Sequence, residues 1–286
     1  AFAQFQIPVE APAAPAIAMA AVPALAVTQS DGEIAVAGDE FCIVFDRHRG
    51  MMASWEWQGL SLLARGPQIQ LWRAPTDNDK HVRNEWAGAG YDRIVHRITS
   101  VEAESVGDRA ARVRVEAVLG AYSVPPPFRC AYTYSIYGSG DVVIETAIEP
   151  LLDKLPPLPR FGIELHLPEG FEQLAWYGLG PHECYVDRKE SGRVGLWRGT
   201  VTDQHVPYIM PQENGNKADC RWAAVTTLRG TGLLAVAMPV INVNAQHHTP
   251  EDLTRALHEP ELQARPETIL HLCLLYTSPS PRDLST

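Results

Sequence analysis

Residues 112–119 read Arg-Val-Arg-Val-Glu-Ala-Val-Leu, and their alternation decides the fold class. Successive side chains of a β-strand point to opposite faces, so the apolar residues at positions 113, 115, 117 and 119 share one face. Arg112, Arg114 and Glu116 share the other face. A period of two with one apolar face predicts a strand that is buried on one side.

Neighbouring stretches support the same fold class. Residues 132–137 and 142–148 are rich in aromatic and β-branched side chains and flank Gly138-Ser139-Gly140-Asp141, which predicts a hairpin. Further strands are predicted at residues 33–37, 41–45, 161–167, 222–228 and 232–238. One short helix, capped by Thr249, is predicted over residues 250–257. Many short strands with few short helices predict an all-β protein, a large antiparallel β-sandwich.

The composition excludes several classes of partner. The 286 residues include 24 Lys and Arg against 34 Asp and Glu, a net charge of −10. Nucleic acids and anionic membranes bind clustered Lys and Arg, and no basic block occurs, so we expect neither as a partner. The five cysteines are scattered and odd in number, without a Cys-x-x-Cys pair. This pattern indicates reduced thiols in a cytoplasmic protein.

The first 28 residues differ in composition from the rest. We expect residues 1–8 to form the last strand of a preceding β-sandwich domain. Residues 9–28 are rich in Ala and Pro, which predicts an extended linker. Residues 11–30 carry no charge, but the three prolines among them would break a membrane-spanning helix. We therefore expect the sandwich domain to occupy residues 29–272.

Motifs of common catalytic sites are missing. The sequence has no His-Glu-x-x-His and no Gly-x-Ser-x-Gly, and no pair of its carboxylates stands out for sugar hydrolysis. His247 and His248 are adjacent, so on a strand they point to opposite faces and suit hydrogen bonding better than one metal ion. We predict no catalytic residue, metal site or cofactor in this chain.

Three polar stretches combine turn residues with groups that can bind sugars. They are residues 71–79, 176–188 and 206–217. Carboxylates and amides pair with hydroxyl groups, and a Trp face stacks on C–H groups. Each stretch also has a structural interpretation. Asp77 and Asn78 can cap turns beside Arg73, whereas the charges at 187–190 can face solvent or a partner. The amides of residues 211–216 can hydrogen-bond within their own loop.

These stretches, in this order, resemble the C-terminal domain of β-galactosidases of glycoside hydrolase family 2, which in some members is a separate small chain. The first stretch is similar to the family's W-R-A-P-x-D-N-D motif, at Trp72, Arg73, Pro75, Asp77, Asn78 and Asp79. The second is similar to G-x-G-P-x-E-x-Y-x-D-R, at Gly178, Gly180, Pro181, Glu183, Tyr185, Asp187 and Arg188. The third is similar to P-Y-x-x-P-Q-E-N-G-N, at Pro211, Gln212, Glu213, Asn214 and Gly215. The resemblance covers roughly residues 2–272.

The resemblance implies a galactose-mutarotase-like supersandwich that packs against a catalytic TIM barrel and completes its galactose pocket. In the family, the two catalytic Glu residues and the magnesium ligands belong to the barrel, which is missing here, so the chain is expected to be inactive alone. The implied reaction of the intact, oligomeric enzyme is hydrolysis of terminal β-linked galactose, as in lactose, with retention.

The resemblance also implies roles for individual residues. The loop after the first motif is implied to be a mobile lid near the pocket. The substrate-proximal candidates are Asp77, Asn78, Asp79, Lys80, His81 and Arg83. The other motif residues are assigned to structure or to the interface with the barrel.

The C-terminal end departs from the family pattern. Residues 273–286 resemble translated sequencing-adapter sequence, so we expect a non-native tail that leaves an unpaired sheet edge. Two other functions stay open. One is a free-standing mutarotase-like enzyme with Glu164 and His166 as its acid and base. The other is a non-catalytic carbohydrate-binding or interaction domain.

Overall fold

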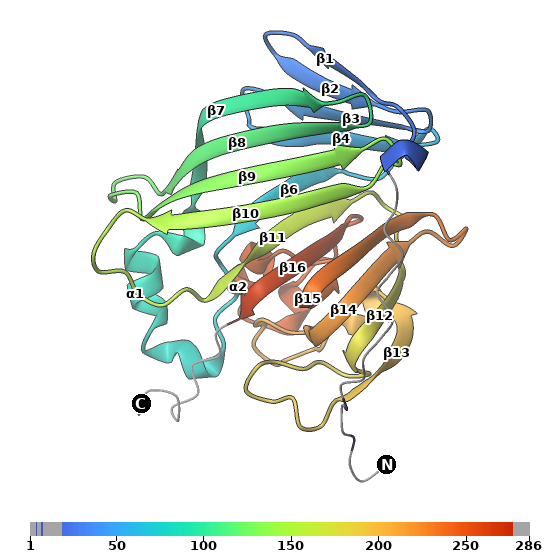
Figure 1. The fold of residues 1–286 in the computed structure, drawn as a ribbon. Helices are drawn as coiled ribbons and strands as arrows, with labels where there is room; N and C mark the ends of the chain where they lie inside the picture. Colours follow the sequence, from blue (N-terminus) through green and yellow to red (C-terminus); the bar gives the residue numbers. More distant parts are fainter. Residues whose placement is uncertain (1–3, 5–6, 8–18, 277–286) are drawn as a thin grey trace.

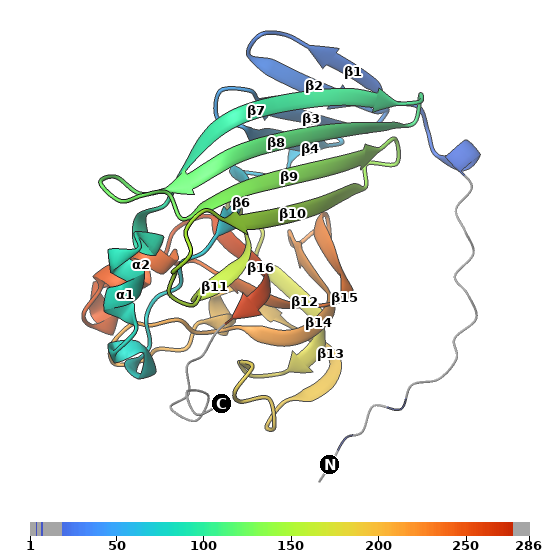
Figure 2. The same ribbon diagram turned by 60° about the vertical axis from the view of Figure 1, so that its left-hand side comes forward.

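Three antiparallel sheets make up the computed structural model, which describes residues 4, 7 and 19–276 (Figures 1 and 2). The first sheet has five strands, in the order β1-β2-β3-β4-β5. The second has four, in the order β10-β9-β8-β7, and the third has seven, in the order β13-β12-β14-β15-β16-β11-β6. The prediction of an all-β sandwich with few short helices is confirmed.

The strands have the following bounds. The five-stranded sheet contains β1 (Ala26–Gln29), β2 (Glu33–Ala37), β3 (Phe41–Asp46), β4 (Met51–Trp57) and β5 (Leu60–Ser61). The four-stranded sheet contains β7 (Val95–Val106), β8 (Ala110–Gly120), β9 (Phe128–Tyr137) and β10 (Val142–Pro150). The seven-stranded sheet contains β6 (Arg65–Gln70), β11 (Arg160–Leu167), β12 (Gln173–Gly180), β13 (Arg193–Thr200), β14 (Lys217–Thr226), β15 (Gly232–Gln246) and β16 (Thr268–Tyr276).

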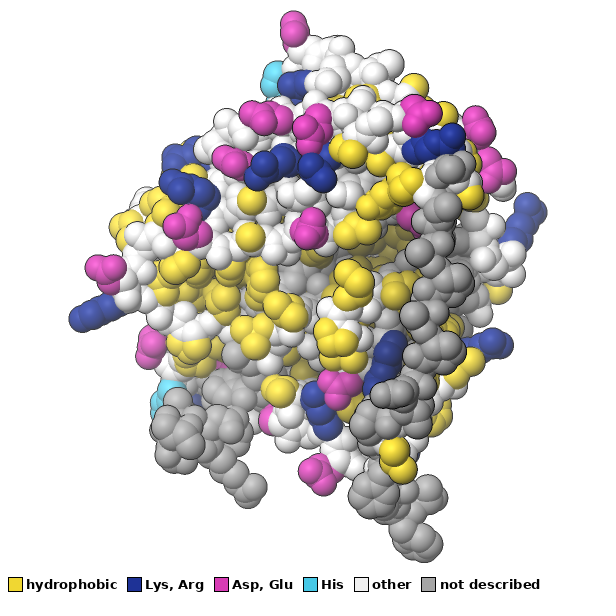
Figure 3. All heavy atoms as spheres, in the orientation of Figure 1, with side chains coloured by type: hydrophobic (Ala, Val, Ile, Leu, Met, Phe, Trp, Pro, Cys, Tyr) yellow, Lys and Arg dark blue, Asp and Glu magenta, His cyan; other side chains and the backbone are white. Residues whose placement is uncertain are grey.

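One main core joins the sheets. Val113 and Val115 of β8 are fully buried, as the alternation predicts. Phe45 of the five-stranded sheet meets Tyr134 of the four-stranded sheet edge-on, with ring centroids 5.0 Å apart. Trp176 of the seven-stranded sheet belongs to the same cluster. In Figure 3, charged side chains lie over the four-stranded sheet and hydrophobic ones gather below it.

The two α-helices, labelled in Figure 2, differ in how the sequence specifies them. The helix α2 (Pro250–Arg255) confirms the predicted helix, and Thr249 forms a capping box with Asp252 at its start. The helix α1 (Arg83–Gly88) was not predicted, since Val82 at its start offers no side-chain cap. Its buried Trp86 fixes it instead by donating a hydrogen bond to the Pro157 carbonyl at 2.7 Å.

Strands cross both of the positions at which we expect the sandwich domain to begin and end. The first strand, β1, starts at Ala26, inside the expected linker, because it pairs with β2. The last strand, β16, continues past residue 272 to Tyr276, where Cys273 and Tyr276 are buried. Of the predicted strand over residues 1–8 only residues 4 and 7 are described, and residues 9–18 of the linker and residues 277–286 lie outside the described residues. No helix of the described part is both long and apolar enough to cross a membrane.

The five- and seven-stranded sheets approach each other closely at a glycine. A Cβ atom on Gly66 of β6 would lie 1.9 Å from the backbone oxygen of Met52 on β4. We predict that Gly66→Ala lowers the free energy of unfolding by about 1–3 kcal/mol or more, because backbone must move to admit the methyl group. Urea unfolding measures this loss. Gly32→Ala is the control, since a Cβ there meets nothing within 4 Å; equal stability of the two variants would contradict the prediction.

Acid should weaken the fold through His96, which lies 3.3 Å from the Tyr132 hydroxyl. Burial lowers the pKa of His96 to about 4, against about 6.5 in an unfolded chain. Between these values the unfolded chain binds a proton that the folded chain does not, so stability falls as pH falls. We expect this group to cost about 1–2 kcal/mol between pH 7 and pH 5.

Urea unfolding at both pH values checks this expectation. His96→Gln should lessen the pH dependence, and His81→Gln, at an exposed histidine, should leave it unchanged. The same pH dependence in all three proteins would rule out His96 as its source.

Candidate functional site

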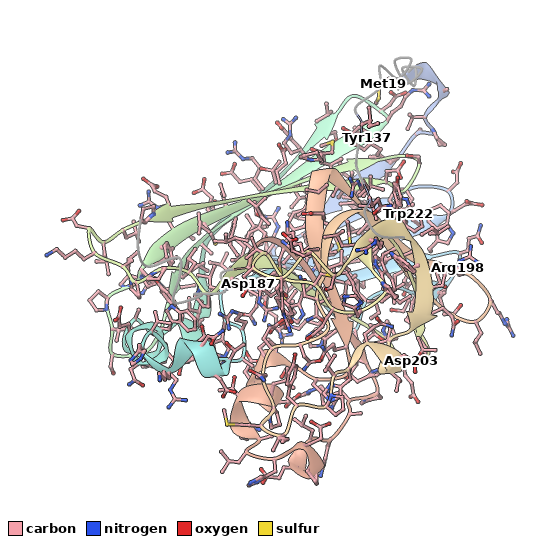
Figure 4. All side chains as sticks on the ribbon, turned by 90° about the horizontal axis from the view of Figure 1, so that it is seen from below. Met19, Tyr137, Asp187, Arg198, Asp203 and Trp222 are labelled. Atoms are coloured by element: carbon pink, nitrogen blue, oxygen red, sulfur yellow. The ribbon has the colours of Figure 1, made fainter. Side chains whose placement is uncertain are left out.

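The three polar stretches converge on one cavity. It has a volume of about 290 Å³ and is referred to below as the motif cleft. It is lined by Arg73, Thr76, Asp77, Asn78, Tyr185, Asp187, Arg188, Tyr208, Gln212 and Glu213. The first and second stretches are about 100 residues apart in the chain, so the fold alone brings them together. Asp187 marks the cleft in Figure 4.

A buried ion pair shapes the first stretch. Arg73 donates two hydrogen bonds to the Asp79 carboxylate, at 2.5 and 3.0 Å, and both side chains are almost fully buried. Asp79 also accepts hydrogen bonds from the backbone N–H of Thr76 at 2.6 Å and from its hydroxyl at 3.1 Å. The Arg73 guanidinium lies over the Trp86 ring, 5.2 Å from its centroid. The carboxylate of Asp79 is therefore directed to internal partners.

The other substrate-proximal candidates divide into two groups. Asp77 and Asn78 are exposed and line the cleft. Lys80 and His81 are exposed at the end of the same turn, and Arg83 opens α1; none of the three lines the cleft. The structure thus brings two of the six predicted residues to the cavity.

Glu183 connects the second stretch to the third. It accepts hydrogen bonds from the Arg188 guanidinium at 2.7 Å, the Tyr208 hydroxyl at 2.5 Å and the Gly215 backbone N–H at 2.8 Å. Gly215 has a positive φ of 81°, and a Cβ there would lie 2.5 Å from the Gln246 amide nitrogen. A glycine is therefore required where the loop crosses the sheet.

The floor of the cleft contains two buried polar groups. Glu213 accepts hydrogen bonds from Arg160 at 3.4 Å and from Asn244 at 3.1 Å. The Tyr185 hydroxyl is buried and has no hydrogen-bond partner within the described structure. Burial, with the charges of Glu213 and Glu183, raises the pKa of Tyr185 well above its usual value. The phenol therefore stays protonated and can donate a hydrogen bond.

Apart from Pro181, the remaining motif residues are buried or half-buried and make contacts inside the domain. Trp72 is buried and donates a hydrogen bond to the Thr254 hydroxyl at 3.1 Å. A Cβ on Gly178 or Gly180 would lie 2.7 Å from the neighbouring strand or ring. Pro181 follows in a cis peptide bond. The other prolines and the amide of this group are at least half-buried: Pro75, Pro211 and Gln212. Asn214 accepts a hydrogen bond from Gln246 at 2.7 Å.

Sequence reasoning missed the strand residues that support the cleft. Arg160, Asn244 and Gln246 are buried and hold the third stretch from below. Arg160 lies on β11 and the other two lie on β15, where nothing in the sequence distinguishes them from other polar strand residues. Only their contacts identify them.

A second buried polar cluster lies on β11 and β16. Glu164 accepts hydrogen bonds from His166 and His271, both at 3.0 Å. Burial alone would raise the pKa of Glu164, but the two histidines and Gln70 hold it well below its usual value. Glu164 is 4% exposed and His166 9%, so the acid and base of a mutarotase-like enzyme have little access to a sugar here.

The adjacent histidines and the cysteines do not form a metal or disulfide site within the described residues. His247 pairs with Glu172 at 2.8 Å, whereas His248 lies against the His205 ring. Within residues 19–276 no group of three or more His, Cys, Asp or Glu is arranged to hold a metal ion. The five cysteines are not paired in disulfides.

Known proteins resemble most of the chain. A family described as "Beta galactosidase small chain" matches residues 37–277. A β-galactosidase of Priestia megaterium is 34% identical over 269 residues, which is 92% of this chain and 25% of that protein. A β-galactosidase of Actinobacillus pleuropneumoniae is 29% identical over 244 residues, 85% of this chain and 23% of its own length. The chain therefore spans about a quarter of the length of these relatives.

The buried pair of Arg73 and Asp79 should matter more for folding than the exposed Asp77. We predict that Asp79→Asn lowers the free energy of unfolding by about 3–5 kcal/mol, because it leaves the Arg73 charge buried without a counter-ion. The matched variant Asp77→Asn should change it by less than about 0.5 kcal/mol. Thermal unfolding of both variants tests this, and a neutral Asp79→Asn would refute the internal role of Asp79.

Proposed function

The chain belongs to the β-galactosidase small-chain family, and we propose on that basis that it is the C-terminal domain of a β-galactosidase. Its motif cleft then faces the galactoside pocket of a catalytic barrel supplied by the rest of the enzyme. The convergence of the three stretches on one cavity carries this proposal. The chain would complete the pocket rather than cleave the sugar.

The side chains of the cleft suit that role. Asp77 and Asn78, exposed at its edge, can accept and donate hydrogen bonds to sugar hydroxyls. Buried ion pairs beneath them fix the backbone, so these groups are held in place before substrate arrives. A wall of this kind also excludes water from the pocket.

The chemistry would belong to the rest of the enzyme. We propose hydrolysis of terminal β-linked galactose with retention, by two carboxylates of the barrel and with magnesium bound there. The isolated chain should show no turnover. We also propose an oligomeric, cytoplasmic enzyme, consistent with five cysteines outside disulfides.

Kinetics of the full-length enzyme test the role of the cleft. The double variant Asp77→Ala, Asn78→Ala should lower kcat/KM for a galactoside about tenfold, the equivalent of one or two hydrogen bonds. Asp153→Ala, at an exposed aspartate outside the cleft, is the control and should leave kcat/KM unchanged. Unchanged kinetics in the double variant, with its fold intact, would refute a role of the cleft in substrate binding.

A further inference from the structure

Four adjacent strands of the seven-stranded sheet present apolar side chains to solvent. The strand register places Leu196, Tyr177, Trp222 and Val236 opposite one another across β13, β12, β14 and β15. Residues directly opposite in an antiparallel pair point to the same face. Leu196 is 55% exposed and Val236 68%. The row therefore lies on the outer face of the sheet.

A second row continues this surface. Ala175, Ala224 and Leu234 stand opposite one another, and Leu234 is 63% exposed. Met238, two residues beyond Val236 on β15, is 89% exposed. These residues and the first row are called the apolar face below. Four strands spaced by about 4.8 Å make it roughly 15 Å wide.

The sequence of β15 indicates that the apolar face is normally covered. Residues 233–238 read Leu-Leu-Ala-Val-Ala-Met, a continuous apolar run without polar alternation. Such a run is typical of a strand buried on both faces. Here Leu233 packs against the core on one side, while its neighbour Leu234 points to solvent on the other.

The chemistry of the apolar face favours a protein over a sugar. Tyr177 and Trp222 could stack on a sugar ring, but the Arg221 guanidinium lies over Tyr177, 5.6 Å from its ring centroid. The aliphatic side chains around the two rings offer no hydrogen bonds to hydroxyl groups. Contiguous exposed aliphatic and aromatic side chains are typical of the centre of a protein interface. Trp222 and Arg198 lie apart from Asp187 in Figure 4, so this surface is separate from the motif cleft.

The N-terminal part of the chain meets the same sheet at its edge. The Gln4 side chain accepts a hydrogen bond from the Val194 backbone N–H at 2.6 Å and donates one to the Val194 carbonyl at 2.8 Å. Val194 lies on β13, the outermost strand of the sheet. The Gln4 side chain therefore lies at the edge strand of the sheet that carries the apolar face.

We propose that the apolar face is the docking surface for the neighbouring domain that precedes this chain in the same β-galactosidase. This proposal rests on the proposed function, which makes the chain the C-terminal quarter of a longer protein. The partner surface is apolar and carries a carboxylate opposite Arg198. That arginine is exposed at the end of the second row, opposite Ala175, and has no partner within the described residues. Burying its charge in an interface requires a counter-ion.

Oxidation of Met238 in the full-length enzyme tests the proposal. Dilute peroxide oxidises exposed methionines, and peptide mass spectrometry gives the rate at each one. We expect Met238 to react roughly tenfold more slowly than free methionine, because the neighbouring domain covers it. Val236→Glu should raise the oxidation rate of Met238 toward that of free methionine, because it places a carboxylate in the apolar interface. Arg198→Glu should have the same effect, because it places a carboxylate opposite the carboxylate of the partner surface.

The matched control is Val106→Glu, at a valine of β7 that is 44% exposed on another sheet; it should leave the Met238 rate unchanged. Oxidation of Met238 at the rate of free methionine would overturn the proposal. If Met238 lost its protection when the subunits dissociate, the apolar face would be covered by a second copy of the chain and not by the neighbouring domain. If Met238 were protected only with added galactoside, the apolar face would be covered by a sugar. The readout does not depend on activity, so either result leaves the proposed function standing.

Discussion

A guanidinium removed from water must have a carboxylate beside it, and the pair of Arg73 and Asp79, beside the motif cleft, meets this requirement. Arg73 also donates to the Pro159 carbonyl at 3.2 Å and lies on the Trp86 ring, so the pair ties the first stretch to α1 and to the start of β11. Within the first stretch, Asp77 and Asn78 are then the exposed residues. The exposed groups of the cleft take their positions from this buried charge.

The other two stretches follow the same rule. Glu183 holds Arg188 and the Gly215 backbone, and Glu213 pairs with Arg160 from below. Buried or half-buried charges tolerate little movement, because loss of either partner leaves the other without compensation. A wall for a substrate pocket needs this rigidity more than it needs reactive groups.

The sequence predicted most of the fold and only part of the site. Period-two alternation located β8, and turn residues located the hairpin of β9 and β10, because both patterns are local. The helix α1 escaped prediction, since a tertiary contact of Trp86 holds it. The motif Asp77-Asn78-Asp79 contains three similar side chains, of which two reach the cleft and one is buried. The ion pair with Arg73 is what distinguishes the buried Asp79 from its two exposed neighbours.

The strand β15 carries exposed apolar side chains in its first half and buried polar ones in its second half. In its second half, Asn244 and Gln246 are buried and hydrogen-bond to the Asn214 carbonyl at 2.7 and 2.6 Å, so polar side chains there are covered by the third stretch. In its first half, Leu234 and Val236 point to the same side with nothing over them in the described structure. Buried polar groups beside exposed apolar ones invert the usual order of a surface. The usual order is restored if another domain covers the apolar first half of β15 while the polar second half supports the cleft. One sheet then carries both the pocket wall and the attachment that holds it in place.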